Sequence, residues 1–143
     1  MRALLDVNVL IALLDADHSP HGRATEWFAS HARAGWASCP RPRMVVCLRI
    51  MSHPGYPDAL PVSAIVERLA EASASGHHEF WPDDLSLLDE RRFDCTRIHG
   101  PRQLTDVYLL ALAVRRGGRF VTFDHSVSIE AIKGAKAKDV VTL

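Results

Sequence analysis

Apolar residues along this chain form short runs that alternate with helical stripes, and their order predicts the fold class. Runs typical of buried strands occupy residues 2–5, 36–39, 79–82, 119–123 and 140–142. Apolar positions at helical spacing indicate helices over residues 7–14, 21–34, 42–52, 61–73, 86–93, 103–116 and 127–132. Strands that alternate with helices favour an α/β/α sandwich with a mainly parallel central sheet.

Length and composition narrow the number of domains. The 143 residues are 48% hydrophobic, enough for one globular domain with a proper core. No internal repeat, linker or low-complexity segment divides them. The sequence therefore predicts a single domain over residues 1–143.

Charge and cysteine usage exclude some classes of protein. Lys plus Arg equals Asp plus Glu at 17 each, so the field of the whole molecule does not attract nucleic acid, and any contact with it needs a local basic patch. The cysteines Cys39, Cys47 and Cys95 are odd in number and form no Cys-x-x-Cys pair. We expect buried, reduced thiols, with neither a disulfide framework nor a zinc site. With no signal peptide and no membrane span in view, we expect a cytoplasmic protein.

Three aspartates stand where predicted strands and helices meet. Asp6 ends the first apolar run, Asp124 ends the run at residues 120–123, and Asp106 opens a long apolar helix. Ligands of parallel sheets bind at the C-terminal edge of the strands, so three acids at that edge would suit a hard cation such as Mg²⁺ or Mn²⁺. Asn8 and Thr122 are small polar neighbours that could orient a carboxylate or a metal-bound water.

Each aspartate also has a purely structural interpretation. Asp6 could cap the helix that follows it, worth about 0.5–2 kcal/mol. Asp106 could interact with its helix dipole, worth roughly 0.3–1 kcal/mol. Asp124 could be an ordinary turn residue. The coincidence of three acids favours a joint role.

Three segments, residues 4–10, 104–111 and 121–124, resemble the acidic motifs of PIN-domain ribonucleases. More narrowly, they resemble the VapC toxins of bacterial VapBC toxin–antitoxin modules, and the resemblance extends over the whole chain, including residues 49–56. It implies a PIN-like fold and a Mg²⁺- or Mn²⁺-dependent endoribonuclease that is usually dimeric and is neutralised by a VapB-type antitoxin. It implies Asp6, Asp106 and Asp124 as the acids of the metal site.

One departure from the family pattern concerns a fourth acid. Members usually carry a glutamate on the helix after the second strand, but no Asp or Glu occurs here between Glu26 and Asp58; the nearest equivalents are Met44 or Val45. Water or another residue could replace the ligand, the domain could be weakly active or inactive, or the stretch could be a local irregularity, engineered or erroneous. We expect a higher Mg²⁺ requirement than that of a four-acid site.

Four arginines are candidate RNA contacts, because arginine side chains supply much of the non-specific affinity for phosphates. They are Arg41, Arg43, Arg49 and Arg102. Each could equally lie on a solvated face.

Two other functions compete with the nuclease hypothesis. The first is a catalytically dead PIN-fold binding module, suggested by the missing glutamate. The second is a phosphatase or phosphoacceptor with Asp6 as nucleophile. A haloacid-type phosphatase would need a second aspartate at position 8, which is Asn8 here, and a receiver-type site would need paired acids after its first strand. Both fit poorly.

Overall fold

The computed structural model describes residues 1–38 and 44–143, and its centre is a parallel sheet. Within these ranges the strands are β1 (Ala3–Leu5), β2 (Trp36–Ser38), β3 (His78–Phe80), β4 (Arg119–Thr122) and β5 (Val140–Thr142). They lie in the order β3-β2-β1-β4-β5, and every pair of neighbours is parallel. The prediction of a mainly parallel sheet is confirmed.

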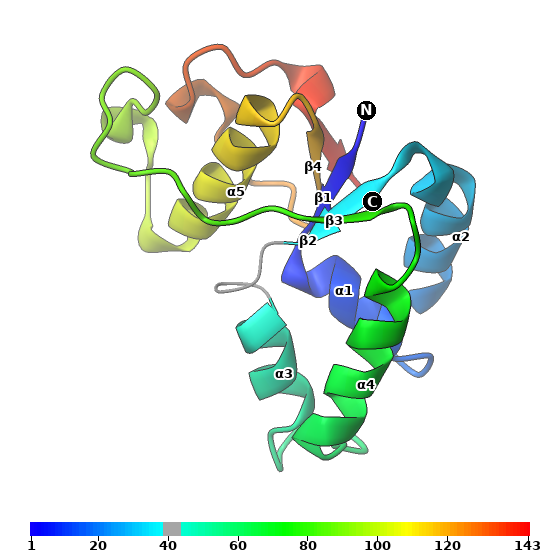
Figure 1. Ribbon diagram of the computed structural model, residues 1–143. Helices are drawn as coiled ribbons and strands as arrows, with labels where there is room; N and C mark the ends of the chain where they lie inside the picture. The colour runs from blue at the N-terminus through cyan, green and yellow to red at the C-terminus, as the bar shows by residue number, and fades with distance from the viewer. Residues whose placement is uncertain (39–43) are drawn as a thin grey trace.

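Helices cover both faces of the sheet (Figure 1). They are α1 (Val7–Leu14), α2 (His21–His31), α3 (Val45–Met51), α4 (Val62–Ser73) and α5 (Leu104–Arg115). Figure 1 shows α5 on one side of the sheet and α2 on the other, with α3 and α4 extending past the end where the strands finish. The fold is an α/β/α sandwich, as predicted.

Alternation along the strands builds a separate core on each face. Leu4 and Phe120 belong to the core under α5, whereas Leu5 and Val121 belong to the core under the other helices. All four side chains are fully buried. Because both faces are covered, the short central strands are continuous apolar runs, as is typical of parallel sheets.

The strand order reverses between β1 and β4. From β1 the chain moves outward through β2 to β3, and it then crosses to the other side of β1 to form β4 and β5. Such a reversal opens a crevice at the C-terminal ends of the two central strands, where α/β proteins bind their ligands. Asp6 follows β1 directly and Asp124 lies two residues beyond β4.

The end of α5 depends on two glycines with different roles. Gly117 follows the helix with φ of 67°, the left-handed conformation that commonly ends a helix. Gly118 is buried, and a Cβ there would lie 2.6 Å from the carbonyl oxygen of Arg2 and from the ring of Trp81. Only glycine lets β4 begin so close to β1.

Two predicted helices are absent as such. The prediction of a helix over 86–93 is wrong, because these residues form turns. Ser86 Oγ accepts from the amide of Leu88 (3.2 Å), and Asp89 Oδ1 accepts from the amide of Arg91 (3.1 Å). Such side-chain bonds compete with helical backbone bonds. The helix predicted over 127–132 is reduced to a 3₁₀ turn, Ile129–Ala131, because Ile132 turns extended and bridges to Phe93.

The cysteines only partly match the prediction. Cys47 is a buried free thiol, and burial raises its pKa to about 11. Cys95 is exposed, so the expectation of burial was wrong for it. Cys39 lies outside the described residues. In the described part of the chain, no helix is both long enough and apolar enough to cross a membrane.

A matched pair of glycine substitutions tests this packing. We expect Gly118→Ala to lower the free energy of unfolding by about 1–3 kcal/mol, since the new methyl group has no space. Gly22→Ala adds the same methyl group to α2 where nothing lies within 4 Å, and it should raise the free energy by roughly 0.5–1 kcal/mol. Urea denaturation of both variants measures this, and equal effects would contradict the model of the β1–β4 approach.

Candidate functional site

Asp6 is held at the end of β1 by its backbone and by its side chain. Its amide donates to the carbonyl of Val121 (2.9 Å), which extends the pairing of β1 with β4 by one residue. Its backbone is extended, and Oδ1 accepts from the amide of Val7 (2.7 Å), so Asp6 is the N-cap of α1. The capping interpretation is therefore correct, but it uses only one of the two carboxylate oxygens.

The second oxygen of Asp6 is bound by Thr122. The Thr122 hydroxyl donates to Asp6 Oδ2 (2.8 Å) and accepts from Asn8 Nδ2 (3.2 Å) and from the amide of Asp124 (3.1 Å). It thus uses its one proton and both lone pairs. Thr122 is fully buried, and Asp6 is only 3% exposed. Both residues predicted to support the acids, Asn8 and Thr122, are part of this network.

Asp124 is fixed by the residues that follow it. Ser126 donates to its Oδ1 from the hydroxyl (2.6 Å) and from the amide (2.7 Å), and these bonds lower the pKa of Asp124. The nearby His125 and a side-chain hydrogen bond with Asp106 lower this pKa further, while partial burial opposes them. The third predicted acid, Asp106, lies in the first turn of α5 and is 8% exposed, and its side chain lies against that of Asp124.

These side chains suit a hard cation by chemistry but do not form a complete metal cluster. Carboxylate, hydroxyl and amide oxygens are the donors that Mg²⁺ and Mn²⁺ prefer. Within residues 1–38 and 44–143, however, no three His, Cys, Asp or Glu side chains are arranged so that they could hold one ion. The structure brings Asp106 to Asp124, and it ties Asp6 to Asp124 through Thr122.

Two of the four arginines predicted to contact RNA lie in the described residues, on different elements of the fold. Arg102 is exposed in the 3₁₀ turn Pro101–Gln103, immediately before the helix that carries Asp106. Arg49 is exposed on α3 and lines a shallow hollow with Ile50 and His53. Arg41 and Arg43 lie outside the described residues.

The position expected to hold a fourth acid lies at the same edge of the sheet. Met44 immediately precedes α3, and its Sδ lies 3.9 Å from the hydroxyl of Ser38, the last residue of β2. Val45 is the first residue of α3 and is 48% exposed. Since β2 neighbours β1, a carboxylate at position 44 would extend from the strand end next to that of Asp6.

Comparison with known proteins identifies the family. No family model matches the chain. Ribonuclease VapC44 of Mycobacterium tuberculosis is 48% identical over 143 residues, which is 100% of both chains. The chain belongs to the VapC ribonuclease family. Ribonuclease VapC38 of the same organism is 44% identical over 126 residues, 87% of this chain and 86% of its own, and ribonuclease VapC39 is 39% identical over 135 residues, 94% and 96%.

A solved VapC structure supports the fold. The crystal structure of Mycobacterium tuberculosis VapC20, described as a sarcin-ricin loop cleaving toxin, superposes with a TM-score of 0.58. The match covers 94% of this chain and 98% of that one at 16% identity. The PIN-like fold predicted from the acidic motifs is confirmed for this VapC chain.

Sequence reasoning missed Ser126 as part of the site. The sequence predicts Asp124 as a metal-site acid or a turn residue and gives Ser126 no role, yet both donors of Ser126 bind the Asp124 carboxylate. An aspartate followed two residues later by serine is the pattern of a turn in which the side chain accepts from the backbone. That spacing was a usable signal.

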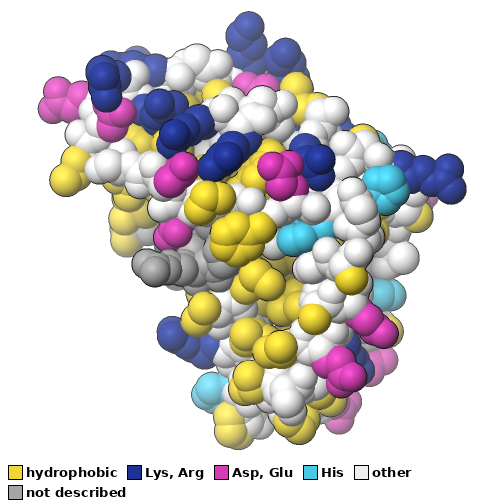
Figure 2. All heavy atoms as spheres, viewed as in Figure 1, with side chains coloured by type: hydrophobic (Ala, Val, Ile, Leu, Met, Phe, Trp, Pro, Cys, Tyr) yellow, Lys and Arg dark blue, Asp and Glu magenta, His cyan; other side chains and the backbone are white. Residues whose placement is uncertain are grey.

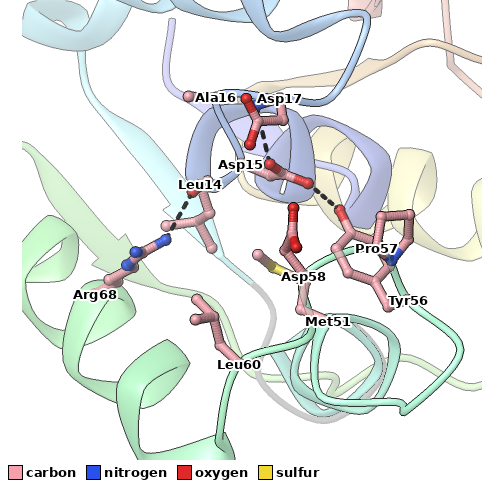
Figure 3. A pocket seen from close by; sticks show the side chains of 10 residues that line it. All are labelled: Leu14, Asp15, Ala16, Asp17, Met51, Tyr56, Pro57, Asp58, Leu60 and Arg68. Carbon is pink, nitrogen blue, oxygen red and sulfur yellow. Dashed lines mark hydrogen bonds between the residues drawn. The ribbon is translucent and has the colours of Figure 1, made fainter.

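A separate cavity of about 240 Å³ lies where the end of α1 meets the segment between α3 and α4 (Figure 3). The Tyr56 hydroxyl donates to Asp15 Oδ2, and Arg68 donates to the carbonyl of Leu14 (3.2 Å). The bond from Tyr56 lowers the pKa of Asp15, while burial and this bond raise the pKa of Tyr56 to about 12. The cavity is lined by neither Asp6, Asp106 nor Asp124, so these contacts join α1 to the α3–α4 pair without forming part of the acidic site.

The Thr122 network makes a testable prediction for this VapC chain. Thr122→Val keeps the shape but removes the donor to a buried carboxylate, so we expect the free energy of unfolding to fall by about 1–3 kcal/mol. Thr122→Ser keeps the hydroxyl and should cost less, about 1 kcal/mol for one methyl group. Chemical denaturation at neutral pH measures both, and a Val variant as stable as the Ser variant would show that the hydroxyl does not hold Asp6.

Proposed function

We propose that this VapC-family chain is a Mg²⁺- or Mn²⁺-dependent endoribonuclease, the toxin of a type II toxin–antitoxin pair acting in the cytoplasm. Full-length identity of 48% to a ribonuclease VapC supports the nuclease part of the proposal. The structural observation that carries it lies at the reversal of strand order, where Thr122 links Asp6 to Asp124 and the side chain of Asp106 lies against that of Asp124.

The metal is proposed from the donor chemistry of these side chains. Asp6, Asp106 and Asp124 would supply its oxygen donors, and the three carboxylates would have to draw closer together around the ion, because they are not arranged to hold one in this structure. A bound divalent ion polarises a phosphoryl oxygen and makes a water molecule a better nucleophile at neutral pH, which is the chemistry that phosphodiester hydrolysis needs.

The residues of the chain prepare the acids for this task. The two hydrogen bonds from Ser126 favour the charged form of the Asp124 carboxylate and lower its pKa. Thr122 and the amide of Val7 each bind one oxygen of Asp6 and so fix the plane of the carboxylate. Asn8 links the two strand ends, because its Nδ2 donates to Thr122 and its Oδ1 accepts from the amide of Phe123 (3.4 Å).

The partners proposed are RNA, a VapB-type antitoxin and a second copy of the chain. Exposed apolar side chains on α3 and α4 support the protein partners: Val45, Ile50, Val62 and Val66 are each 38–52% exposed. Figure 2 shows hydrophobic side chains gathered over this lower part of the molecule and basic ones mostly over the upper part. An apolar surface of this kind is typical of a protein interface.

A PIN-fold binding module without catalytic activity is the second candidate. The residue that favours it is Met44, which lies against Ser38 at the end of β2, the strand next to β1, where the family pattern expects a glutamate. This alternative predicts RNA binding without cleavage at any concentration of Mg²⁺ or Mn²⁺.

Substitution of Asp6 tests the proposed nuclease. Asp6→Asn should abolish RNA cleavage, because the amide removes the negative charge. Asparagine still caps α1, and losing the hydrogen bond from Thr122 should lower the free energy of unfolding by about 1–3 kcal/mol, which leaves the fold intact. Cleavage of labelled RNA and circular dichroism of the same preparation measure the two effects. Asp17→Asn, at an exposed position beyond α1, is the matched control and should cleave like the wild type. Full activity of Asp6→Asn would refute the assignment.

Restoring an acid at position 44 tests the cost of the missing glutamate. We expect Met44→Glu to lower the Mg²⁺ concentration for half-maximal cleavage by roughly 10-fold, because an added carboxylate strengthens the cation site. Met44→Gln has the same length without the charge and should leave the requirement unchanged. A magnesium titration of cleavage compares the three proteins, with Val45→Glu testing the neighbouring position. No gain from either glutamate would show that the chain does not need the fourth acid.

A further inference from the structure

Arg23 lies over an aromatic ring at the edge of the acidic site. Its guanidinium carbon is 5.2 Å from the centre of the Phe123 ring, within the range of a cation–π interaction. Phe123 stands between Thr122 and Asp124 in the sequence. Arg23 is in the first turn of α2, and its side chain is exposed to solvent.

The ring that supports Arg23 is itself fixed to the site. The amide of Phe123 donates to Asn8 Oδ1, and the partly buried ring packs against the core that contains Leu5 and Val121. The guanidinium therefore rests on a residue whose backbone belongs to the acidic network. An arginine placed this way loses less conformational freedom on binding a ligand than one extending into solvent.

Most other arginines of the described residues have partners that neutralise or occupy them. Six form ion pairs with carboxylates: Arg2, Arg91, Arg92, Arg97, Arg115 and Arg116. Arg68 donates to a backbone carbonyl. Arg119 also lies over a ring, that of Trp27, but unlike Arg23 it is only partly exposed. Within residues 1–38 and 44–143, Arg23, Arg33, Arg49 and Arg102 form no ion pair. Of these, Arg23 and Arg102 lie next to elements that carry the acids.

The charge at this edge explains why such an arginine would matter. The chain has no net charge, so its overall field does not draw RNA, and carboxylates at the site repel phosphates. A polyanion can approach only if cations stand at the same edge. Arg23 lies over Phe123, the residue before Asp124, and Arg102 lies in the turn that leads into α5 and its Asp106.

We infer that Arg23, supported by Phe123, is a contact for a backbone phosphate of the RNA substrate. This inference rests on the proposed function and adds a positioning residue to it. The planar guanidinium can keep the Phe123 ring on one face while its N–H groups donate to phosphate oxygens. The contact holds the RNA strand beside Asp124 and does not touch the reacting atoms.

The experiment compares two arginines of one helical segment. Arg23→Gln removes the proposed contact. Arg33→Gln removes an equally exposed, unpaired charge from the 3₁₀ turn Ala32–Ala34, which precedes the start of β2 and so lies at the opposite edge of the sheet. Both are made in the Asp6→Asn background, and binding of a fluorescein-labelled single-stranded RNA is measured by anisotropy over a range of salt concentrations.

We expect Arg23→Gln to weaken RNA binding by about 10-fold and to reduce the slope of log affinity against log salt by about 0.7, the value for one phosphate contact on a single strand. Arg33→Gln should change affinity less than twofold. Arg23→Lys keeps the charge but not the flat group on the ring, and it should fall between wild type and Arg23→Gln. With Asp6 restored, Arg23→Gln should raise KM and leave kcat nearly unchanged, because a positioning contact does not act on the chemical step.

Two negative results differ in meaning. If the wild-type chain cleaves RNA but Arg23→Gln and Arg33→Gln behave alike, the inference about Arg23 is wrong and the proposed function stands. If the wild-type chain neither binds nor cleaves RNA in Mg²⁺ or Mn²⁺, the proposed function fails and the inference fails with it.

Discussion

The parallel pairing of β1 with β4 is the constraint on which the rest of this structure depends. Ala3, Leu4 and Leu5 pair with Arg119, Phe120 and Val121, and the amide of Asp6 continues the ladder to the carbonyl of Val121. This register sets the Asp6 carboxylate opposite Thr122. A shift by one residue would turn Leu4 and Leu5 to the wrong cores and would separate the hydroxyl from the acid.

The site shows how a small set of polar groups can be kept at the border of two apolar cores. One hydroxyl, that of Thr122, joins Asp6, Asn8 and the backbone of Asp124 with no spare donor or acceptor. Asp124 receives its own support from Ser126. Full use of each polar group matters here because a buried carboxylate without donors is costly.

Much of the fold could be predicted from periodicity, because the strands are buried on both faces and the longer helices have clear apolar stripes. The helix predicted at 103–116 corresponds closely to α5, which Gly117 follows in the left-handed conformation. Failures came where side chains overrode the pattern. The side chains of Ser86 and Asp89 accept hydrogen bonds from nearby amides, so residues predicted as a helix form turns. The spacing of apolar residues does not reveal such hydrogen bonds.

The candidate site was predictable in part. Asp6 and Asp124 could be proposed as site residues from the sequence because each ends an apolar run. Asn8 and Thr122 could be proposed as their supports because each lies two residues from one of these acids. The contact between Arg23 and Phe123 could not be predicted from the sequence, because the two residues are a hundred positions apart and neither belongs to a recognisable motif. Contacts of this kind depend on the way α2 returns along the sheet.

The distance in sequence between Asp6 and Thr122, 116 residues, has a consequence for how the molecule comes into being. β1 has no partner on its β4 side until residues 119–122, more than a hundred positions later, have left the ribosome. Two strands separated by such a long loop pair slowly, so the pairing of β1 with β4 forms late in folding. A nascent or truncated chain that lacks β4 therefore has no assembled acidic site, and any activity of this site must wait until β4 has been made and has paired with β1.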